Sequence, residues 1–251
     1  MDFSRNWLFI ENNVQESLAK YRILVVGLGI GSYLSELLVR TGFSNMCLVD
    51  GDTVDLSNLN RQNYTAADVG AMKTDACSKR LKAINPNLNL KLVSEYADET
   101  SLPQLIKECD FVINTIDFDA PIFSLCTKLA QENQKVELFP INLGFGAAVF
   151  IFDEKSSNFE SFFESEKPLK NQILNYIVVQ KGISNDLLNK VDQYYEQLGH
   201  VGYDPQLGVS SYLTSALLTA NLVKLIAGEP VKVFPDFYYS NAFRSIKEEC
   251  T

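Results

Sequence analysis

The sequence has few cysteines, and they are not spaced for a disulfide framework or a zinc site. The five cysteines are scattered, odd in number and form no C-x-x-C pair: Cys47, Cys77, Cys109, Cys126 and Cys250. This distribution predicts reduced, mostly buried thiols. The single histidine, His200, lies in an expected loop, where no pattern supports a role as general base.

Basic residues are also scarce, because 22 Lys and Arg face 31 Asp and Glu and leave a net charge of −9. This balance argues against a nucleic-acid partner, since phosphate-backbone binding depends on Lys and Arg. The N-terminus has no basic region followed by an apolar one, and the longest uncharged stretch, residues 207–223, is shorter than the about 20 apolar residues of a membrane helix. We therefore expect a cytoplasmic protein that does not contact a membrane.

One stretch near the N-terminus predicts a strand, a tight turn and a helix that can bind a phosphate. The apolar run at 23–26 leads into Gly27-Leu28-Gly29-Ile30-Gly31-Ser32, after which leucines recur at helical spacing until Gly42. Glycines let backbone N–H groups approach an anion, and the first helical turn offers unpaired donors. Gly27, Gly29, Gly31 and Ser32 are therefore candidate nucleotide-binding residues, although the pattern also fits a tight turn without a ligand.

The charged residues that follow indicate which nucleotide binds. Residues 47–49 are predicted to form a buried strand, and Asp50 at its end can bind both ribose hydroxyls. Arg61 and Lys73 come next, and a dinucleotide dehydrogenase has no evident use for two such cations on its phosphates. A triphosphate has more charge to offset, so the pattern favours ATP. Taken singly, Arg61 is also explained by a surface salt bridge, and Lys73 by a solvated charge at a helix start.

Four motifs, in this order along the chain, resemble the ThiF/MoeB/HesA superfamily, the adenylating domain related to ubiquitin-activating enzymes. They are the Gly-rich loop, residues 50–62 (D-x-D-x-V-x-x-S-N-L-x-R-Q), residues 69–73 (V-G-x-x-K) and Asp117 after an apolar run. The similarity covers residues 5–152 well and the C-terminal quarter more loosely. Two positions depart from the family: the loop is one residue shorter than G-x-G-G-x-G-S, and Phe118 and Asp119 follow Asp117 where the family has Asn.

The resemblance implies an enzyme that transfers AMP from MgATP to a carboxylate and releases pyrophosphate. By this resemblance, Asp50 would bind the ribose, Asp52 and Gln62 the nucleotide, Asn58 and Arg61 the phosphates, Lys73 the leaving group and Asp117 the Mg²⁺. The carboxylate substrate would be the C-terminus of a ubiquitin-like carrier or of a small peptide, or an amino acid. The family is usually dimeric, and the resemblance makes Arg5 a candidate to reach the partner's triphosphate; a solvated surface arginine is the alternative.

Alternating strand and helix patterns up to residue 152 predict an α/β fold. The order favours a Rossmann-like, mostly parallel sheet with helices on both faces, with the ligand at the carboxyl ends of the strands. Later strands near 147–152 are expected to be antiparallel, as in the family. Strands are expected at 88–93, 110–116 and 136–141, and helices at 11–19, 73–84, 101–107 and from 118 or 119 to about 133.

The chain divides into three predicted regions. Residues 1–152 form an N-terminal arm and the Rossmann-like ATP-binding core, and residues 153–206 form a helical insertion whose aromatic residues are expected in a core. Residues 207–251 complete the same domain with a helix at 210–227, apolar nearly all round, and a strand region at 231–239. Such a helix is expected to be buried or to lie at a subunit interface.

The sequence leaves the step after adenylation open. Many relatives pass the acyl group to a cysteine in the crossover region, but there is no cysteine between Cys126 and Cys250, so a thioester step of that type is not expected. Three interpretations remain: an enzyme that ends at the adenylate, a dehydratase or cyclase that activates a carboxylate, and a non-catalytic ATP-binding subunit that supports an active partner. A Rossmann oxidoreductase is a distant fourth.

Overall fold

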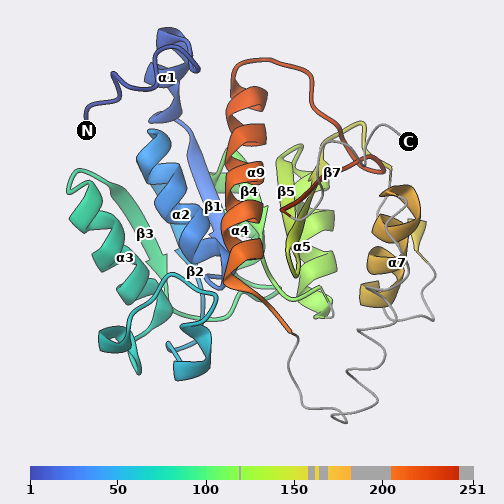
Figure 1. Ribbon diagram of the computed structural model, residues 1–251, viewed down its shortest axis with the longest axis horizontal. Helices are drawn as coiled ribbons and strands as arrows, with labels where there is room; N and C mark the ends of the chain where they lie inside the picture. The colour runs from blue at the N-terminus through green and yellow to red at the C-terminus, as the bar shows by residue number, and fades with distance from the viewer. Residues whose placement is uncertain (119, 158–161, 164–168, 182–204, 243–251) are drawn as a thin grey trace.

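The computed structural model describes residues 1–118, 120–157, 162–163, 169–181 and 205–242 (Figure 1). Asp119, His200, Cys250 and most of the expected insertion lie outside the described residues. The elements, in chain order, are α1 (Asn12–Leu18), β1 (Arg22–Val26), α2 (Ile30–Thr41), β2 (Asn45–Val49), the 3₁₀ turns η1 (Leu56–Asn58) and η2 (Ala66–Asp68), α3 (Lys73–Ile84), β3 (Asn89–Val93), α4 (Leu102–Glu108), β4 (Phe111–Asn114), α5 (Pro121–Glu132), β5 (Val136–Leu143), β6 (Gly146–Phe152), α7 (Leu169–Lys181), α9 (Gly208–Ile226) and β7 (Tyr238–Asn241).

The strands form one seven-stranded sheet in the order β3-β2-β1-β4-β5-β6-β7. The pairs from β3 to β5 are parallel, and β5–β6 and β6–β7 are antiparallel. This confirms the predicted α/β fold with later antiparallel strands. The chain moves outward from β1 to β3 and then returns to the other side of β1 at β4. The loops after β1 and β4 therefore diverge at the switch point of the sheet, where such folds bind ligands.

Helices cover both faces of the sheet, as predicted (Figure 1). In β1, Ile23 and Val25 pack in the cluster that includes residues of α2, α3 and α9, while Leu24 and Val26 pack with residues of α4 and α5. All four side chains are buried. A strand that is buried on both faces has an uninterrupted apolar sequence, which explains why apolar and polar residues do not alternate along β1.

The long helix α9 packs against β5, β6 and α2 and closes one face of the sheet (Figure 1). It is long and apolar enough to cross a membrane by length and composition, but the core helix of a soluble protein passes the same test. Its buried face is partly polar, and these groups bond to β5: Asn142 donates to the Ser211 hydroxyl at 3.1 Å, and Thr214 donates to Asn142 Oδ1 at 2.9 Å. The helix was predicted to be buried or to lie at a subunit interface; one side of it is buried within the chain, whereas Val209 and Tyr212 on it are exposed.

The C-terminal quarter differs from the prediction in one place. A strand region was expected at 231–239, whereas β7 begins at Tyr238, paired with Val149 of β6. The proline at 235 has no N–H to give to a sheet ladder, so regular pairing starts after it. The one described helix of the insertion, α7, packs through Ile173 and Ile177 on a cluster with aromatic residues of β5 and β6. Of the insertion's own aromatic residues that the structure describes, Phe163 and Tyr176 pack partly buried against this cluster, whereas Phe162 is 40% exposed.

A carboxyl group is buried in the core between β4, β5 and α5. Glu137 is fully buried, and its Oε1 accepts hydrogen bonds from Asn114 Nδ2 at 2.8 Å and from the Thr127 hydroxyl at 3.0 Å. Its Oε2 has no hydrogen-bond partner among the residues described. Burial raises the pKa of Glu137 to about 7, and the two hydrogen bonds only partly oppose this. Cys126, also buried, is a neighbouring titratable group; burial raises the pKa of its thiol, and the Glu137 carboxyl raises it further.

We expect the wild type to lose stability as the pH rises from about 4.5 to about 7, and we expect Glu137→Gln to remove this loss. The folded pKa lies above the value of 4.5 expected in the unfolded chain, so the unfolded state releases its proton first as the pH rises, and stability falls until the folded pKa is passed. The shift corresponds to about 3 kcal/mol. Urea unfolding at pH 5 and pH 8 should show the wild type losing stability relative to the variant, whose amide oxygen can still accept both bonds. If the difference in unfolding free energy between wild type and variant were the same at pH 5 and at pH 8, this explanation would be wrong.

Candidate active site

The loop after β1 is built for close approach of the backbone. Gly27 has a φ of +93°, which favours glycine, and a Cβ there would lie 2.6 Å from Thr115 Oγ1 and 2.9 Å from Thr115 O. The Thr115 hydroxyl donates to Gly27 O at 2.8 Å. The loops after β1 and β4 are therefore fixed to each other at the switch point of the sheet.

Two of the predicted nucleotide-binding residues have packing roles within the loop. A Cβ at Gly31 would lie 2.9 Å from Val25 Cγ1, so this glycine lets α2 pack on β1. The buried Ser32 hydroxyl donates to Gly29 O at 2.7 Å and accepts from the Asn63 N–H at 2.9 Å. These contacts hold the loop in shape. Contact of Gly31 or Ser32 with a nucleotide stays a prediction.

Asp50 lies at the carboxyl end of β2 and is turned toward the glycine loop. Its Oδ2 accepts from the Leu28 N–H at 2.6 Å, and its Oδ1 accepts from the Asp52 N–H at 2.8 Å. The residue is 9% exposed. Burial raises the pKa of Asp50, while Lys73 and the two N–H donors act in the opposite direction.

Lys73 lies between the two carboxylates of the D-x-D motif. Its Nζ donates to Asp52 Oδ2 at 2.7 Å and lies 3.8 Å from Asp50 Oδ2. Tyr96 donates its hydroxyl to Asp52 Oδ1 at 2.5 Å. Partial burial alone would raise the pKa of Asp52, but the bonds from Lys73 and Tyr96 lower it. The Lys73 charge is therefore already offset by carboxylates.

Arg61 differs from Lys73, because all of its partners among the described residues are neutral. Its Nε donates to Gln206 Oε1 at 3.0 Å, and its Nη1 donates to Ser57 O at 2.7 Å and to Asn60 Oδ1 at 2.9 Å. Burial lowers the pKa of Arg61, and no carboxylate of the described residues counters this effect. A partly buried guanidinium without an anion nearby is suited to a phosphate.

The amide of Gln62 supplies a second group that can receive a ligand. Gln62 is buried, its Oε1 has no hydrogen-bond partner in the part of the chain that the structure describes, and its Nε2 lies 3.4 Å from the point that a Cβ on Gly29 would occupy. Asn58, also buried, uses its Oδ1 to accept from the Asp55 N–H at 3.0 Å, which caps η1. An orphaned buried amide beside a glycine loop fits a bound nucleotide.

Asp117 lies in the loop between β4 and α5, two residues after Thr115, and its side chain is exposed. No cluster of three or more metal-binding side chains is found in the described part of the chain. Magnesium does not need one, because it keeps several waters and is held by one or two carboxylates together with phosphate oxygens. The loop therefore fits Mg²⁺ bound together with a triphosphate.

Arg5 is not brought to the other predicted residues within one chain. The arm that carries it is tied to the end of α2, where Asn6 donates to Gln15 and Gln15 Nε2 donates to Thr41 O at 2.8 Å. The glycine loop lies at the start of the same helix, and twelve residues of helix span about 18 Å. Figure 1 shows the N-terminal arm at one end of the strands and the η1 and η2 loops at the other.

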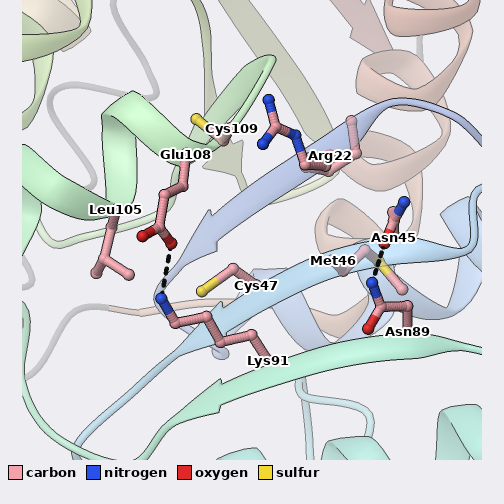
Figure 2. A pocket seen from close by; sticks show the side chains of 10 residues that line it. Arg22, Asn45, Met46, Cys47, Asn89, Lys91, Leu105, Glu108 and Cys109 are labelled. Atoms are coloured by element: carbon pink, nitrogen blue, oxygen red, sulfur yellow. Dashed lines mark hydrogen bonds and ion pairs between the residues drawn. The ribbon is translucent and has the colours of Figure 1, made fainter.

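A separate cavity of about 220 Å³ lies at the opposite ends of the strands from the glycine loop (Figure 2). Its wall includes the first residues of three strands, Arg22, Asn45 and Asn89, which places it at their amino ends. The polar groups in it are paired with each other or with neighbours, as in the ion pair of Lys91 and Glu108 at 2.8 Å. This cavity is not the predicted nucleotide site.

Several residues of the site were not predicted from the sequence. They are Thr115, Tyr96, Asn63 and Gln206, which bond to Gly27, Asp52, Ser32 and Arg61 respectively. Thr115 and Tyr96 follow β4 and β3, so the rule that ligands lie at the carboxyl ends of strands could have indicated them. Nothing in the sequence pattern indicates Gln206, which is 145 residues from Arg61.

The fold and this site together define a doubly wound α/β domain with a tight glycine loop and charged side chains at the switch point of its sheet, which is the arrangement of nucleotide-binding domains. The model of the ThiF family matches residues 3–250, so the chain belongs to the ThiF family. This confirms the family resemblance stated from the motifs.

Relatives of the chain include enzymes of two kinds. The chain is 40% identical over 105 residues to the molybdopterin-synthase adenylyltransferase of Escherichia coli, over 41% of this chain and 42% of that protein. It is 34% identical over 151 residues to the tRNA threonylcarbamoyladenosine dehydratase of Bacillus subtilis, over 58% of this chain and 57% of that protein. The matched segments thus span about half the length of these relatives.

The fold also matches a solved structure with ATP named in its description. The structure of E. coli MccB with ATP aligns with a TM-score of 0.67 at 18% identity, covering 97% of this chain and 71% of that chain. At this identity the likeness shows a shared fold.

Proposed function

We propose that this protein uses ATP to adenylate a carboxylate, giving an acyl-adenylate and pyrophosphate. The observation that carries the proposal is Arg61, a partly buried guanidinium bonded to neutral oxygens at the carboxyl edge of the sheet. The buried Gln62 amide beside Gly29 supports it. The named activities of the relatives in the ThiF family agree with this chemistry.

In the proposed reaction, a carboxylate oxygen attacks the α-phosphorus and the bond to the oxygen that bridges to the β-phosphate breaks. The pyrophosphate leaves with the electron pair. No side-chain nucleophile is needed, so the protein acts by positioning and by offsetting charge. In this proposal Asp50 binds the ribose, Arg61 binds the phosphates, and Lys73 shifts from Asp52 toward the charge that develops on the leaving group.

We propose that Asp117 holds Mg²⁺, which would offset phosphate charge when it is bound. Asp117→Asn keeps the shape of the side chain but removes its charge, so we expect exchange between ATP and pyrophosphate to need about tenfold more Mg²⁺ or higher. The measurement is a Mg²⁺ titration of the exchange rate. Equal Mg²⁺ requirements for variant and wild type would remove Asp117 from this role.

We propose that no acyl group passes to a cysteine of the described chain. Burial raises the pKa of each of the four thiols there, to about 11 for Cys47, to about 12 for Cys77 and Cys109, and well above the usual range for Cys126. A thiol that stays protonated is a poor nucleophile. These four free thiols also support the proposal of a cytoplasmic location.

We propose that the acid is the C-terminus of a protein or peptide. The name of the molybdopterin-synthase adenylyltransferase of E. coli, in which the adenylylated partner is itself a protein, supports a protein substrate. A second candidate is a dehydratase that activates a carboxylate, supported by the B. subtilis relative. The test is to incubate the protein with MgATP and a panel of peptide C-termini, amino acids and threonylcarbamoyl tRNA, and to detect adenylates and dehydrated products by mass spectrometry. An adenylate on one acid would identify the substrate class, whereas ATP binding with no product from any acid would favour a non-catalytic subunit.

We propose a homodimer in which Arg5 reaches the site of the partner. The arm exposes three neighbouring apolar side chains, Trp7, Leu8 and Phe9, each at least 69% exposed. Such a patch is costly on a monomer and suits a subunit contact. Size-exclusion chromatography with light scattering should give a dimer, and a strict monomer would contradict the role of Arg5 across the interface.

A further inference from the structure

The Arg61 side chain is oriented by three hydrogen bonds that leave part of its fork free. Nε bonds to Gln206, and Nη1 bonds to Ser57 O and Asn60 Oδ1. No partner of Nη2 is found among the residues that the structure describes. A guanidinium binds phosphate in two places through its fork, so this nitrogen can meet the ligand while the others fix the direction of the side chain.

The main chain at Gln206 is held by contacts that do not involve its side chain. Asn60 Nδ2 donates to Gln206 O at 3.3 Å. Two residues later, Gly208 approaches so closely that a Cβ there would lie 2.9 Å from Asn60 O. The start of α9 is therefore anchored on the loop that carries Arg61, and a substitution of the Gln206 side chain leaves these contacts in place.

We propose that Gln206 is a positioning residue for Arg61: its amide oxygen orients the guanidinium toward the phosphates without neutralising it. This inference rests on the proposed function, because it assumes that Arg61 binds the phosphates of ATP. A glutamate at this position could make the same contact, but its charge would pair with Arg61 and compete with the phosphate. An amide accepts the hydrogen bond and leaves the positive charge available.

The contact also joins two distant parts of the chain. Gln206 is the last residue of the region predicted as an insertion, and Arg61 lies in the loop after η1. A change in the main chain at Gln206 would therefore change the direction of the Arg61 guanidinium.

The experiment compares Gln206→Glu with Gln206→Ala by titrating the purified full chain with MgATP and, separately, with adenosine. Glu should weaken MgATP binding by about tenfold or more, and Ala by a smaller factor, because Ala loses the orientation but adds no competing charge. Adenosine binding should stay unchanged in both variants, since it depends on the ribose side of the site. Gln104→Glu, which adds the same charge on α4 beside Glu108, is the matched control and should bind both ligands as the wild type does.

A merely structural role for Gln206 predicts the opposite order. Glu would then restore or strengthen the contact with Arg61, so its MgATP affinity would equal that of the wild type or exceed that of Ala, and this result would overturn the inference alone. Equal weakening of MgATP and adenosine would also overturn it, by showing a general distortion. A wild type that binds neither ligand would overturn the proposed function itself and this inference with it.

Discussion

Replacing Arg61 by alanine is expected to lower the rate of exchange between ATP and pyrophosphate by about a hundredfold or more. Unlike Lys73, which pairs with carboxylates, the Arg61 guanidinium bonds only to neutral groups among the described residues. Its positive charge is therefore available for the phosphates. The fold should survive, because Arg61 has no salt bridge among the described residues and its removal leaves no buried carboxylate unpaired. The exchange rate and the circular dichroism spectrum of the variant test both parts of this expectation.

Arg22→Ala is the matched control for this substitution. Arg22 forms an exposed ion pair with Asp110 at the amino edge of the sheet, 3.3 Å apart, beside the cavity in Figure 2. Exposed pairs contribute about 0 to 1 kcal/mol, so this variant should keep both its stability and its exchange rate. Exchange by Arg61→Ala at the rate of the wild type would remove Arg61 from the mechanism.

Lys73→Met is expected to destabilise the protein as well as to abolish exchange. The Lys73 ammonium forms ion pairs with both Asp50 and Asp52. The side chains of Lys73 and Asp50 are each 8% exposed, and that of Asp52 is more exposed. Its removal leaves two carboxylates close together without a cation, and breaking a buried ion pair costs about 3 to 5 kcal/mol. We expect the lower end of that range, about 3 kcal/mol, because water reaches Asp52. Urea unfolding at pH 7 measures the loss.

A double variant separates the two effects of Lys73. Lys73→Met combined with Asp52→Asn removes one of the two carboxylates, so part of the lost stability should return while exchange remains absent. Lys91→Met is the control, since Lys91 forms an exposed pair with Glu108 and its loss should change stability by less than about 1 kcal/mol. Wild-type stability of Lys73→Met would show that the two aspartates do not need the cation.

The sequence predicted most of the sheet and both of its key loops, because their signals are local. The run at 23–26 with glycines after it and the apolar end of β2 before Asp50 specify strand ends without reference to distant residues. The helix at 73–84 was placed at its observed bounds, since Pro86 after Asn85 and the spacing of Leu81 and Ile84 mark its end. The start of β7 was misplaced because residues 231–234 (Val-Lys-Val-Phe) have strand propensity, whereas regular pairing with β6 begins only after the proline at 235.

The parts of the site that the sequence did not reveal depend on tertiary contacts. The pairing of Lys73 with both aspartates joins α3 to the end of β2, and the hydrogen bond that Arg61 donates to Gln206 joins residues that are 145 positions apart in the sequence. Motif spacing assigns roles to charged residues but cannot show which charges are already offset. The structure adds this distinction, which separates Lys73 from Arg61.

The most direct test of the account is exchange of labelled pyrophosphate into ATP by the purified wild-type protein, with Mg²⁺ and an acid from the panel. Exchange requires that AMP be transferred reversibly to the carboxylate and that pyrophosphate be the leaving group. The account predicts label in ATP that depends on both Mg²⁺ and the acid, and that is lost in Arg61→Ala. Tight ATP binding with release of ADP, and no label in ATP with any acid, would contradict adenylation.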